Sequence, residues 1–498
     1  MQEILKIENG IARNDAYQLQ YPINLSINEG ESVVIYGPNG GGKSLLVGLL
    51  TGAIPLKPFL KDGKAGLHVI KKEKGGIRSI IFNDVYGANP PAYYQQRWNH
   101  GDEMSFPRVK DVINTHDNES STVQSKLNVY KEILENVKQA LDISSIENKK
   151  VNQLSSGELR RFQLVRVLYD APSVLIVDNP YIGLDTESRS NLTEVLEKLS
   201  KYITLVLVVC RPSDIPSFIK RRIYVEKRKV YENFQIREET IEFEQDIFQN
   251  KVVIPSPLTH DYEEIKRGEE IVGFNNINLS YGTRPIFKNL CLHIKSGEHW
   301  ALTGPNGAGK STMLSLMLAD NPIAYSLPIQ LFGRKRGSGE SIWDIKKRIG
   351  YVSPEIFSTY KKRLPVIQIL ASGLHDTIGL YHRPTASEIS ICREWLSAFG
   401  LSDIEEKSYL DLSHGEQRLV LLIRSFVKSP QLLILDEPFH GLDDFWCNKA
   451  KKIIDEYMKM DDRRTLVMVS HYMNELPACI DRFLKITKLN DILANDKE

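Results

Sequence analysis

The chain has 498 residues and an ordinary globular composition, with 42% hydrophobic and 26% charged residues, which excludes a largely disordered protein. Its 64 basic and 63 acidic side chains leave a net charge of +1, so no overall basic excess is present to drive nucleic-acid binding. The length is too great for one ordinary domain of about 150 residues and predicts several compact units.

The first half carries an ordered series of predicted α/β elements. ESVVIYG (31–37) predicts a strand that ends at a glycine, and GPNGGGKS (37–44) leads from it into a helical run. LSSGE (154–158) precedes a second helical run. SVLIVD (173–178) and TLVLVV (204–209) are continuous aliphatic runs, which are typical of parallel strands buried on both faces.

The same series recurs in the second half. A strand-like EHWALTG (298–304) leads into GPNGAGKST (304–312), and LSHGE (412–416), LLILD (432–436) and TLVMVS (465–470) follow in the same order. The lysine of the glycine-rich motif recurs after 267 residues, and the later motifs recur after 258. Several motifs repeated in register at so long a period indicate a duplicated domain rather than a solenoid.

The duplication predicts two α/β domains, at residues 1–230 and 266–498. Residues 231–265 are predicted to form a linker, because they are charged, carry PSP at 255–257 and show no clear period. In each copy a longer polar and helical stretch separates the glycine-rich motif from LSSGE or LSHGE. We expect this stretch to form a separate subdomain.

Both glycine-rich motifs fit the phosphate-loop pattern G-x-x-x-x-G-K-[ST]. Glycines let backbone N–H groups surround phosphate oxygens, and the N-terminus of the following helix adds a favourable dipole. We expect Lys43 and Lys310 to reach the β- and γ-phosphates of ATP, and Ser44 and Ser311 to ligate Mg²⁺. The predicted loop residues are Gly37, Pro38, Asn39, Gly40, Gly41, Gly42, Lys43 and Ser44 in the first copy, and Gly304, Pro305, Asn306, Gly307, Ala308, Gly309, Lys310, Ser311 and Thr312 in the second.

An aspartate ends each of two equivalent predicted strands, Asp178 in VLIVDNP and Asp436 in LLILDEP. Ligands of open α/β sheets bind at the carboxyl ends of the strands, so we expect these acids to hold Mg²⁺ through its water shell. A buried aspartate could also merely cap a helix, but the GLD turn that follows each one disfavours that reading.

LSSGE and LSHGE each place a serine and a glycine N–H at a predicted helix start, which makes a second anion site. An isolated motif of this kind is more commonly an ordinary helix N-cap. Each motif, however, stands at the same distance before its acid strand in both copies, which favours a function. The predicted residues are Ser155, Gly157, Ser413 and Gly415.

Together these motifs resemble the ATP-binding-cassette (ABC) ATPases over both halves of the chain. The resemblance implies two tandem P-loop domains, each with a mostly parallel sheet core, an antiparallel β subdomain and a helical signature subdomain. It also implies a monomer whose halves form an intramolecular head-to-tail sandwich. One ATP would lie between Gly37–Ser44 and the signature at Ser413 and Gly415, and the other between Gly304–Thr312 and Ser155 with Gly157. Tethering raises the effective concentration of this closure.

A narrower likeness concerns residues 331–353, LFGRKRGSGESIWDIKKRIGYVS. This segment looks like the corresponding part of the ModF-type proteins, twin cassettes associated by name with molybdate transport. From the residues alone it is a basic, glycine-bearing loop that leads into a helix.

The resemblance also implies that the two halves are unequal. The family places a glutamate after the magnesium aspartate to polarise the attacking water, and Glu437 stands there in the second copy. The first copy has Asn179, whose amide can orient water but cannot accept its proton. The family histidine near the γ-phosphate corresponds to His471, whereas the first copy offers Cys210 or, with a one-residue slip, Arg211. We therefore expect the second-copy loop to catalyse most hydrolysis, with Glu437, His471 and Lys310 as the catalytic residues.

Two further family positions are less regular. Tyr281, 23 residues before Gly304, is expected to stack on adenine, although a strand-end surface aromatic is an alternative. The same distance before Gly37 gives Asn14, with Tyr17 nearby. The family also carries a glutamine that touches the metal and relays to a transporter partner. Its place holds Pro354 in the second copy and Asn83 or Asp84 in the first, with Gln95 and Gln96 further on.

The five scattered cysteines form no CxxC pair, which indicates reduced cytosolic thiols rather than a disulfide framework or a zinc site. The first residues show no signal-peptide core, and no run approaches the roughly 18 apolar residues of a membrane span. We expect a cytoplasmic protein that acts at the inner face of the cell membrane only through a partner.

Three functions remain open. The sequence favours the ATP-binding subunit of a transporter whose permease is a separate chain. A soluble twin cassette acting on ribosomes or nucleic acid is disfavoured. Twin cassettes of the translation-factor kind usually keep a glutamate in both copies and have a longer, helical, basic linker. This chain has Asn179 in place of one glutamate, and its residues 226–267 hold ten acids against seven bases. Basic runs at 220–222 and 227–229 are better explained as solvated edges than as a nucleic-acid surface. A regulatory or repair-associated protein without a permease is the third alternative.

Overall fold

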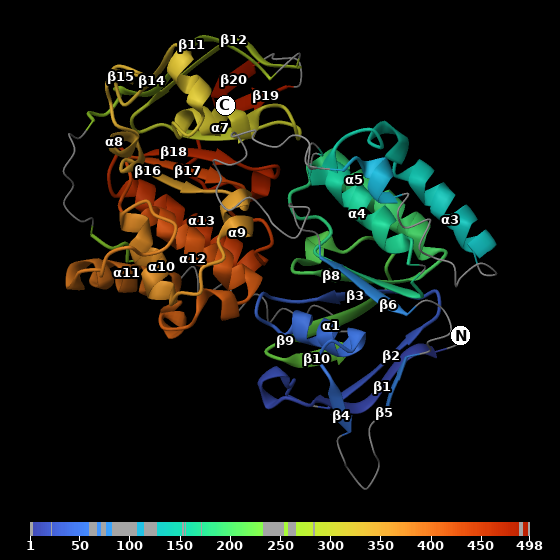
Figure 1. Cartoon of the computed structure of the whole chain (residues 1–498). Helices are drawn as coiled ribbons and strands as arrows, with labels where there is room; N and C mark the ends of the chain where they lie inside the picture. The colour runs from blue at the N-terminus through green and yellow to red at the C-terminus, as the bar shows by residue number, and fades with distance from the viewer. Residues whose placement is uncertain are drawn as a thin grey trace. The chain divides into compact units, whose positions relative to one another are not determined.

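The structure is a computed structural model that describes residues 3–20, 22–58, 67–70, 76–81, 107–113, 127–151, 154, 156–170, 172–232, 253–256, 265–281, 284–487 and 492–496. The chain divides into two compact units, of which the first ends at Glu232 and the second begins at Val253 among these residues (Figure 1). Most of the predicted linker lies outside them. So do five residues named in the sequence predictions: Ser155, Asn83, Asp84, Gln95 and Gln96.

The first unit is built on a six-stranded sheet in the order β10-β9-β3-β8-β7-β6. In this sheet the five strands β9, β3, β8, β7 and β6 are parallel to their neighbours, and β10 pairs antiparallel with β9. The strands are β3 (Ser32–Tyr36), β6 (Ile77–Ile81), β7 (Val174–Asp178), β8 (Thr204–Val209), β9 (Arg221–Glu226) and β10 (Lys229–Glu232). A second, antiparallel sheet holds β1 (Glu3–Ala12), β2 (Ile23–Asn28), β4 (Leu56–Pro58) and β5 (Leu67–Ile70).

The second unit repeats this arrangement. Its six-stranded sheet has the order β16-β17-β18-β13-β19-β20, parallel as far as β19 and antiparallel at β20. Its strands are β13 (His299–Thr303), β16 (Ile349–Val352), β17 (Leu432–Asp436), β18 (Thr465–Val469), β19 (Arg482–Ile486) and β20 (Ile492–Asp496). The antiparallel sheet holds β11 (Glu270–Tyr281), β12 (Arg284–Lys295), β14 (Ile329–Leu331) and β15 (Arg334–Lys335).

The helices flank these sheets. The first unit has α1 (Lys43–Thr51), α3 (Leu127–Ala140), α4 (Ser156–Leu168) and α5 (Thr186–Ser200). The second has α7 (Lys310–Met317), α8 (Ile342–Lys346), α9 (Pro354–Thr359), α10 (Val366–Leu374), α11 (Ala386–Phe399), α12 (His414–Phe426) and α13 (Asp444–Lys459). The predicted α/β class, the strands at the six aliphatic runs and the helices after both phosphate loops and both signatures are confirmed. No helix in the part of the chain that the structure describes is long and apolar enough to cross a membrane.

Side-chain alternation along the strands gives each unit two cores, one on each face of its large sheet. In β17, Leu433 and Leu435 contribute to the core shared with α10–α13, while Leu432 and Ile434 contribute to the core shared with β11, β12 and α7. Successive strand residues point to opposite faces, so a strand covered on both sides must be apolar at every position. This explains why LLILD is a continuous apolar run that ends in one acid.

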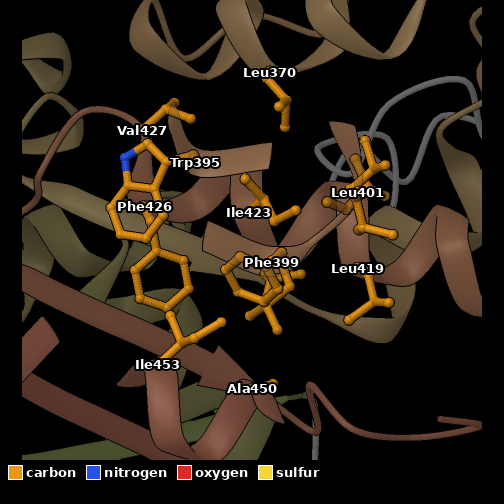
Figure 2. Close-up of a cluster of buried hydrophobic side chains, with 14 of the residues drawn as sticks. Leu370, Trp395, Phe399, Leu401, Leu419, Ile423, Phe426, Val427, Ala450 and Ile453 are labelled. Atoms are coloured by element: carbon orange, nitrogen blue, oxygen red, sulfur yellow. The ribbon is translucent and has the colours of Figure 1, made fainter. Parts of the chain in front are cut away.

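An aromatic cluster holds the helical part of the second unit together. Figure 2 shows side chains from α10, α11, α12 and α13 that converge around Trp395 and Phe426. The ring centroids of these two residues lie 5.2 Å apart, and Phe426 meets Tyr457 edge-on at 5.1 Å. Such rings bury a large apolar area and add specific ring–ring contacts. The cluster packs against α12, the helix that begins within the LSHGE motif.

Truncation of this cluster should destabilise the second unit. Trp395→Ala is expected to cost about 3–5 kcal/mol of unfolding free energy, because a fully buried indole leaves a cavity that its neighbours refill only in part. Trp343→Ala is the matched control, since that indole is 59% exposed, and its cost should stay within about 0.5 kcal/mol. Urea unfolding followed by circular dichroism compares the two variants. Equal midpoints for both would contradict this account of the core.

Residues 331–353 contain a buried ion pair that their sequence does not reveal. The side chains of Arg336 and Glu340 pair with 0% and 2% of their surface exposed. Glu340 also accepts the backbone N–H groups of Gly337 and Ser338, both at 2.8 Å, and the guanidinium lies over the ring of Tyr325. The segment is therefore a closed loop organised by an internal ion pair, and not only the basic loop that its composition suggests.

Candidate functional site

Each phosphate loop joins a central parallel strand to a helix, β3 to α1 and β13 to α7. The ammonium of Lys43 donates to the carbonyl oxygens of Gly37 and Pro38 at 2.6 and 2.8 Å. Lys310 donates in the same way to the carbonyl oxygens of Gly304 and Pro305, at 2.6 and 3.0 Å. Ser44 and Ser311 are the next residues, in the first turn of their helices. The two loops are thus folded alike around a central lysine.

Close backbone packing explains the first glycine of each loop. Gly37 has φ 149° and Gly304 has φ 146°, and a Cβ atom there would lie 2.1 Å and 2.3 Å from the carbonyl oxygens of Val225 and Ile486. The glycine before each helix takes a left-handed conformation, with φ 109° at Gly42, and no side chain caps the helix. The N-terminal N–H groups of α1 and α7 are thus not blocked by a capping side chain, which suits an anion.

The acids Asp178 and Asp436 end β7 and β17 at the same edge of the sheets as the phosphate loops. Burial raises the pKa of Asp178 to about 6, against the opposing charge of Lys43. Burial and then the charge of Glu437 raise the pKa of Asp436, against the opposing charge of Lys310. A divalent cation would relieve the cost of ionising either carboxylate. One carboxylate and one serine hydroxyl per unit suit Mg²⁺, which keeps several waters and binds phosphate oxygens.

Glu437 follows Asp436 in a left-handed backbone conformation, with φ 48°. One carboxylate oxygen, Oε1, lies 2.8 Å from Nε2 of His471, and the other, Oε2, lies 2.7 Å from Nδ1 of His440. Burial opposes ionisation of Glu437, but the nearby His440 and His471 outweigh it and hold the pKa of this carboxyl well below its usual range. A carboxylate with a lowered pKa has the chemistry that a general base needs to orient water and take its proton.

His440 is a site residue that sequence reasoning missed. It lies three residues after Glu437, in the turn FHGLD that connects β17 to α13, and only 5% of it is exposed. Its backbone carbonyl accepts a hydrogen bond from the guanidinium of Arg418 in α12. The sequence offers one signal, a histidine in the turn that follows the strand ending at Asp436. A lone histidine in a turn is too common for that signal to be read without the fold.

The first unit keeps the backbone of this site and changes its chemistry. Asn179 has φ 49°, close to the φ of Glu437. Its side-chain amide donates to Oδ1 of Asp178 at 2.9 Å. The amide is thus tied to the predicted magnesium ligand, and it offers no basic oxygen to water.

Sheet register resolves which residue of the first unit replaces His471. In each unit the residue after the acid donates its N–H to the next strand, to the carbonyl of Val208 in the first unit and of Val469 in the second. The same two valines pair with the acids across the sheet. Val208 and Val469 are therefore equivalent, and two residues later stand Cys210 and His471. The register places Cys210 at this position and not Arg211.

The signature of the second unit begins α12. Ser413 is its N-cap, with Oγ accepting the N–H of Glu416 at 3.3 Å while the Glu416 carboxylate accepts the N–H of Ser413 at 2.8 Å. The hydroxyl hydrogen of Ser413 takes no part in this capping box, so the serine can both cap the helix and donate to an anion. Gly415 lies in the first turn of α12, and Gly157 lies in the first turn of α4.

The predicted adenine positions lie on different elements in the two units. Tyr281 is the last residue of β11, and Tyr17 ends a 3-10 turn at Asp15–Tyr17 with 46% exposure. In the first unit Arg228 lies in the β9–β10 turn. Its backbone N–H donates to the carbonyl of Gly41 at 2.8 Å, and its guanidinium donates to the carbonyl of Ala16 at 3.3 Å. This arginine thereby ties the phosphate loop to the segment that carries Tyr17.

At the expected glutamine position of the second unit, the chain already turns into a helix. Ser353 caps α9 by accepting the N–H of Ile356 at 3.3 Å, and Pro354 is the first helical residue. Pro354 has no side-chain amide to touch a metal. The corresponding first-copy predictions fall among residues that the structure leaves undescribed.

Comparisons with known proteins agree with the fold and the motifs. A family model described as "ABC transporter" matches residues 21–182 and 287–440. The ABC transporter ATP-binding protein ModF of Escherichia coli K12 is 33% identical over 97% of this chain and 96% of its own. An uncharacterised ABC transporter ATP-binding protein of Schizosaccharomyces pombe is 29% identical, over 97% of each chain. A solved structure titled "RNase-L Inhibitor" aligns with TM-score 0.52 and 20% identity over 96% of this chain and 87% of that one, a likeness of fold.

Proposed function

The chain belongs to the ABC transporter family and is an ATP hydrolase with two tandem cassettes, and we propose that it binds two Mg-ATP between its copies and hydrolyses mainly one of them. The observation that carries the proposal is the contrast between Glu437, whose carboxylate lies 2.7 and 2.8 Å from two histidine nitrogens, and Asn179, which is tied to Asp178. After the predicted magnesium ligand, the second copy offers a carboxylate for the attacking water and the first copy offers an amide.

In the proposed arrangement each phosphate loop faces the signature of the other copy. The family resemblance and the matching motifs of the two copies support this pairing. Tethering within one chain makes the closure intramolecular. The competent site combines Lys310, Ser311, Asp436, Glu437 and His471 with Ser155 and Gly157. The second site combines Lys43, Ser44 and Asp178 with Ser413 and Gly415, and Asn179 stands where the base would be.

The residues of the competent site have separate roles. Lys310 stabilises the negative charge that develops on the transferred phosphoryl group, and Asp436 with Ser311 would hold Mg²⁺. When bound, Mg²⁺ neutralises charge on the β- and γ-phosphate oxygens. Glu437 orients the attacking water and accepts its proton, and His471 contacts the γ-phosphate. Tyr281 stacks on the adenine in this proposal.

The energy of hydrolysis is proposed to drive a separate membrane permease, with this chain at the cytoplasmic face. The 33% identity to a protein named as a transporter ATP-binding protein supports this role. Pro354 in place of the partner-relay glutamine keeps a second candidate, an ABC protein that acts without a permease in regulation, repair or translation. Affinity purification from detergent-solubilised membranes separates the two. A stoichiometric polytopic protein is expected, and its absence from material that retains ATPase activity would favour the second candidate.

Closure of the two copies on ATP should make the chain more compact. In Glu437→Gln, Mg-ATP stays unhydrolysed and holds both proposed interfaces, so the radius of gyration from small-angle scattering should fall relative to the nucleotide-free protein. The Lys43→Ala/Lys310→Ala double variant is the control and should not respond. An unchanged radius in Glu437→Gln would argue against intramolecular pairing, and a doubled mass would indicate pairing between chains instead.

A further inference from the structure

The turn after β17 is fixed at both ends. At its start the backbone N–H of Glu437 donates to the carbonyl of Val469 at 3.0 Å, and at its end Asp443 caps α13 by accepting the N–H of Trp446 at 2.9 Å. Between them the N–H of His440 donates to the carbonyl of Glu437 at 3.3 Å, which folds the turn back on itself. The imidazole of His440 is therefore brought against the Glu437 side chain by backbone geometry.

The two histidines contact different oxygens of one carboxylate. His471 lies at Oε1 and His440 at Oε2, at 2.8 and 2.7 Å, and their side chains are 3% and 5% exposed. A general base needs at least one oxygen within reach of water. With both histidines in place, each oxygen of Glu437 already has a neighbour.

The histidines differ in how they are attached. His471 follows the end of β18, where its proposed partner is the γ-phosphate of ATP. His440 belongs to the same short turn as Glu437, and Arg418 of α12 anchors its carbonyl. A move of His471 toward phosphate would release Oε1 for water, whereas His440 would stay on Oε2.

We propose that His440 is a positioning residue for hydrolysis, which holds the Glu437 carboxylate by Oε2 while Oε1 engages the attacking water. This inference rests on the proposed hydrolysis at the second-copy site. His440 would act through the orientation of the Glu437 carboxylate. Small displacements of a reacting group lower the rate by large factors. A packing role alone would require only that the ring fill its buried space.

The first copy offers an internal comparison. Ile182 stands at the position of His440, 258 residues earlier, in the turn NPYIGLD. The same copy has Asn179 in place of Glu437, and that amide binds Asp178 instead of facing a histidine. The histidine and the carboxylate that it would hold are both absent from this turn.

Steady-state kinetics of His440→Ile test the proposal, because this change copies the first-copy side chain. We expect kcat to fall by about 10- to 100-fold, with KM and the calorimetric Kd for Mg-ATP unchanged within about twofold. His440→Asn should restore most of kcat, since the amide nitrogen of asparagine can stand near the place of Nδ1 and donate to Oε2. Ile182→Val, the matched change in the other turn, should leave kcat unaltered.

Combination with Glu437→Gln shows whether His440 acts through the base. His440→Ile should cause almost no further loss in that background, since the carboxylate that it positions is gone. Wild-type kcat in His440→Ile, a loss confined to KM or Kd, failure of His440→Asn to restore turnover, or full additivity with Glu437→Gln would each overturn the proposal. If Glu437→Gln itself kept its turnover, the proposed function would fail instead.

Discussion

Substitution of Glu437 by glutamine is expected to lower the rate of ATP hydrolysis by about 10²–10⁴-fold, the usual contribution of a general base. Glutamine keeps the size of the side chain and its ability to orient water, but it cannot take the proton. The phosphate loop and Asp436 remain, so Mg-ATP should still bind. A coupled assay of phosphate release at saturating Mg-ATP measures the loss.

Asn179→Ala is the matched substitution in the first copy. It removes the hydrogen bond to Asp178 but no base, so turnover should change only modestly. Full activity in Glu437→Gln, or a loss in Asn179→Ala as deep as that in Glu437→Gln, would refute the assignment of the second-copy loop as the competent site.

Lys310→Ala is expected to lower kcat by about 10²–10³-fold, the loss typical of a preorganised group that stabilises transition-state charge. The buried ammonium of Lys310 lies within its own loop, where it would meet the charge developing on the γ-phosphoryl oxygens. Lys43→Ala makes the same change in the first copy. It should weaken nucleotide binding there but leave more turnover.

Stopped-flow phosphate release and binding of a fluorescent ATP analogue separate the two effects. The deciding comparison is which of the two variants loses more of its hydrolysis rate. If Lys43→Ala lowers the rate of hydrolysis more than Lys310→Ala does, the first-copy loop forms the competent site, and our assignment of the two sites is reversed.

The local parts of the site could be predicted from the sequence because short-range geometry dictates them. Gly309 takes a left-handed φ of 104° directly before the helix, and the ammonium of Lys310 turns back six residues to the carbonyl oxygen of Gly304. The acid Asp436 terminates a run that is apolar because both faces of β17 are covered. Such features appear as fixed spacings within one stretch of chain.

Features that depend on tertiary contacts could not be predicted. Whether Cys210 or Arg211 stands at the place of His471 depends on the register between β7 and β8, which no single segment encodes. The burial of Arg336 and Glu340 cannot be read from composition, which indicated only a basic, glycine-bearing loop that leads into a helix. His440 carries no motif of its own, and its significance comes from its distance to Glu437.

The Ser413 motif shows how two explanations can both hold. Its sequence fits a helix cap and an anion-binding signature, and the capping box of α12 confirms the first. The capping bonds use the hydroxyl oxygen as an acceptor and leave its hydrogen for another acceptor. The second function remains part of the proposed closure on ATP.

Single-turnover release of labelled phosphate tests the central claim, the inequality of the two sites, most directly. Protein loaded with labelled ATP at both sites is mixed with Mg²⁺ and excess unlabelled ATP, and released phosphate is counted per chain. We expect one phosphate in a rapid phase and a second nucleotide that is retained as ATP for much longer, with the rapid phase abolished by Glu437→Gln. Rapid release of two phosphates per chain would contradict it.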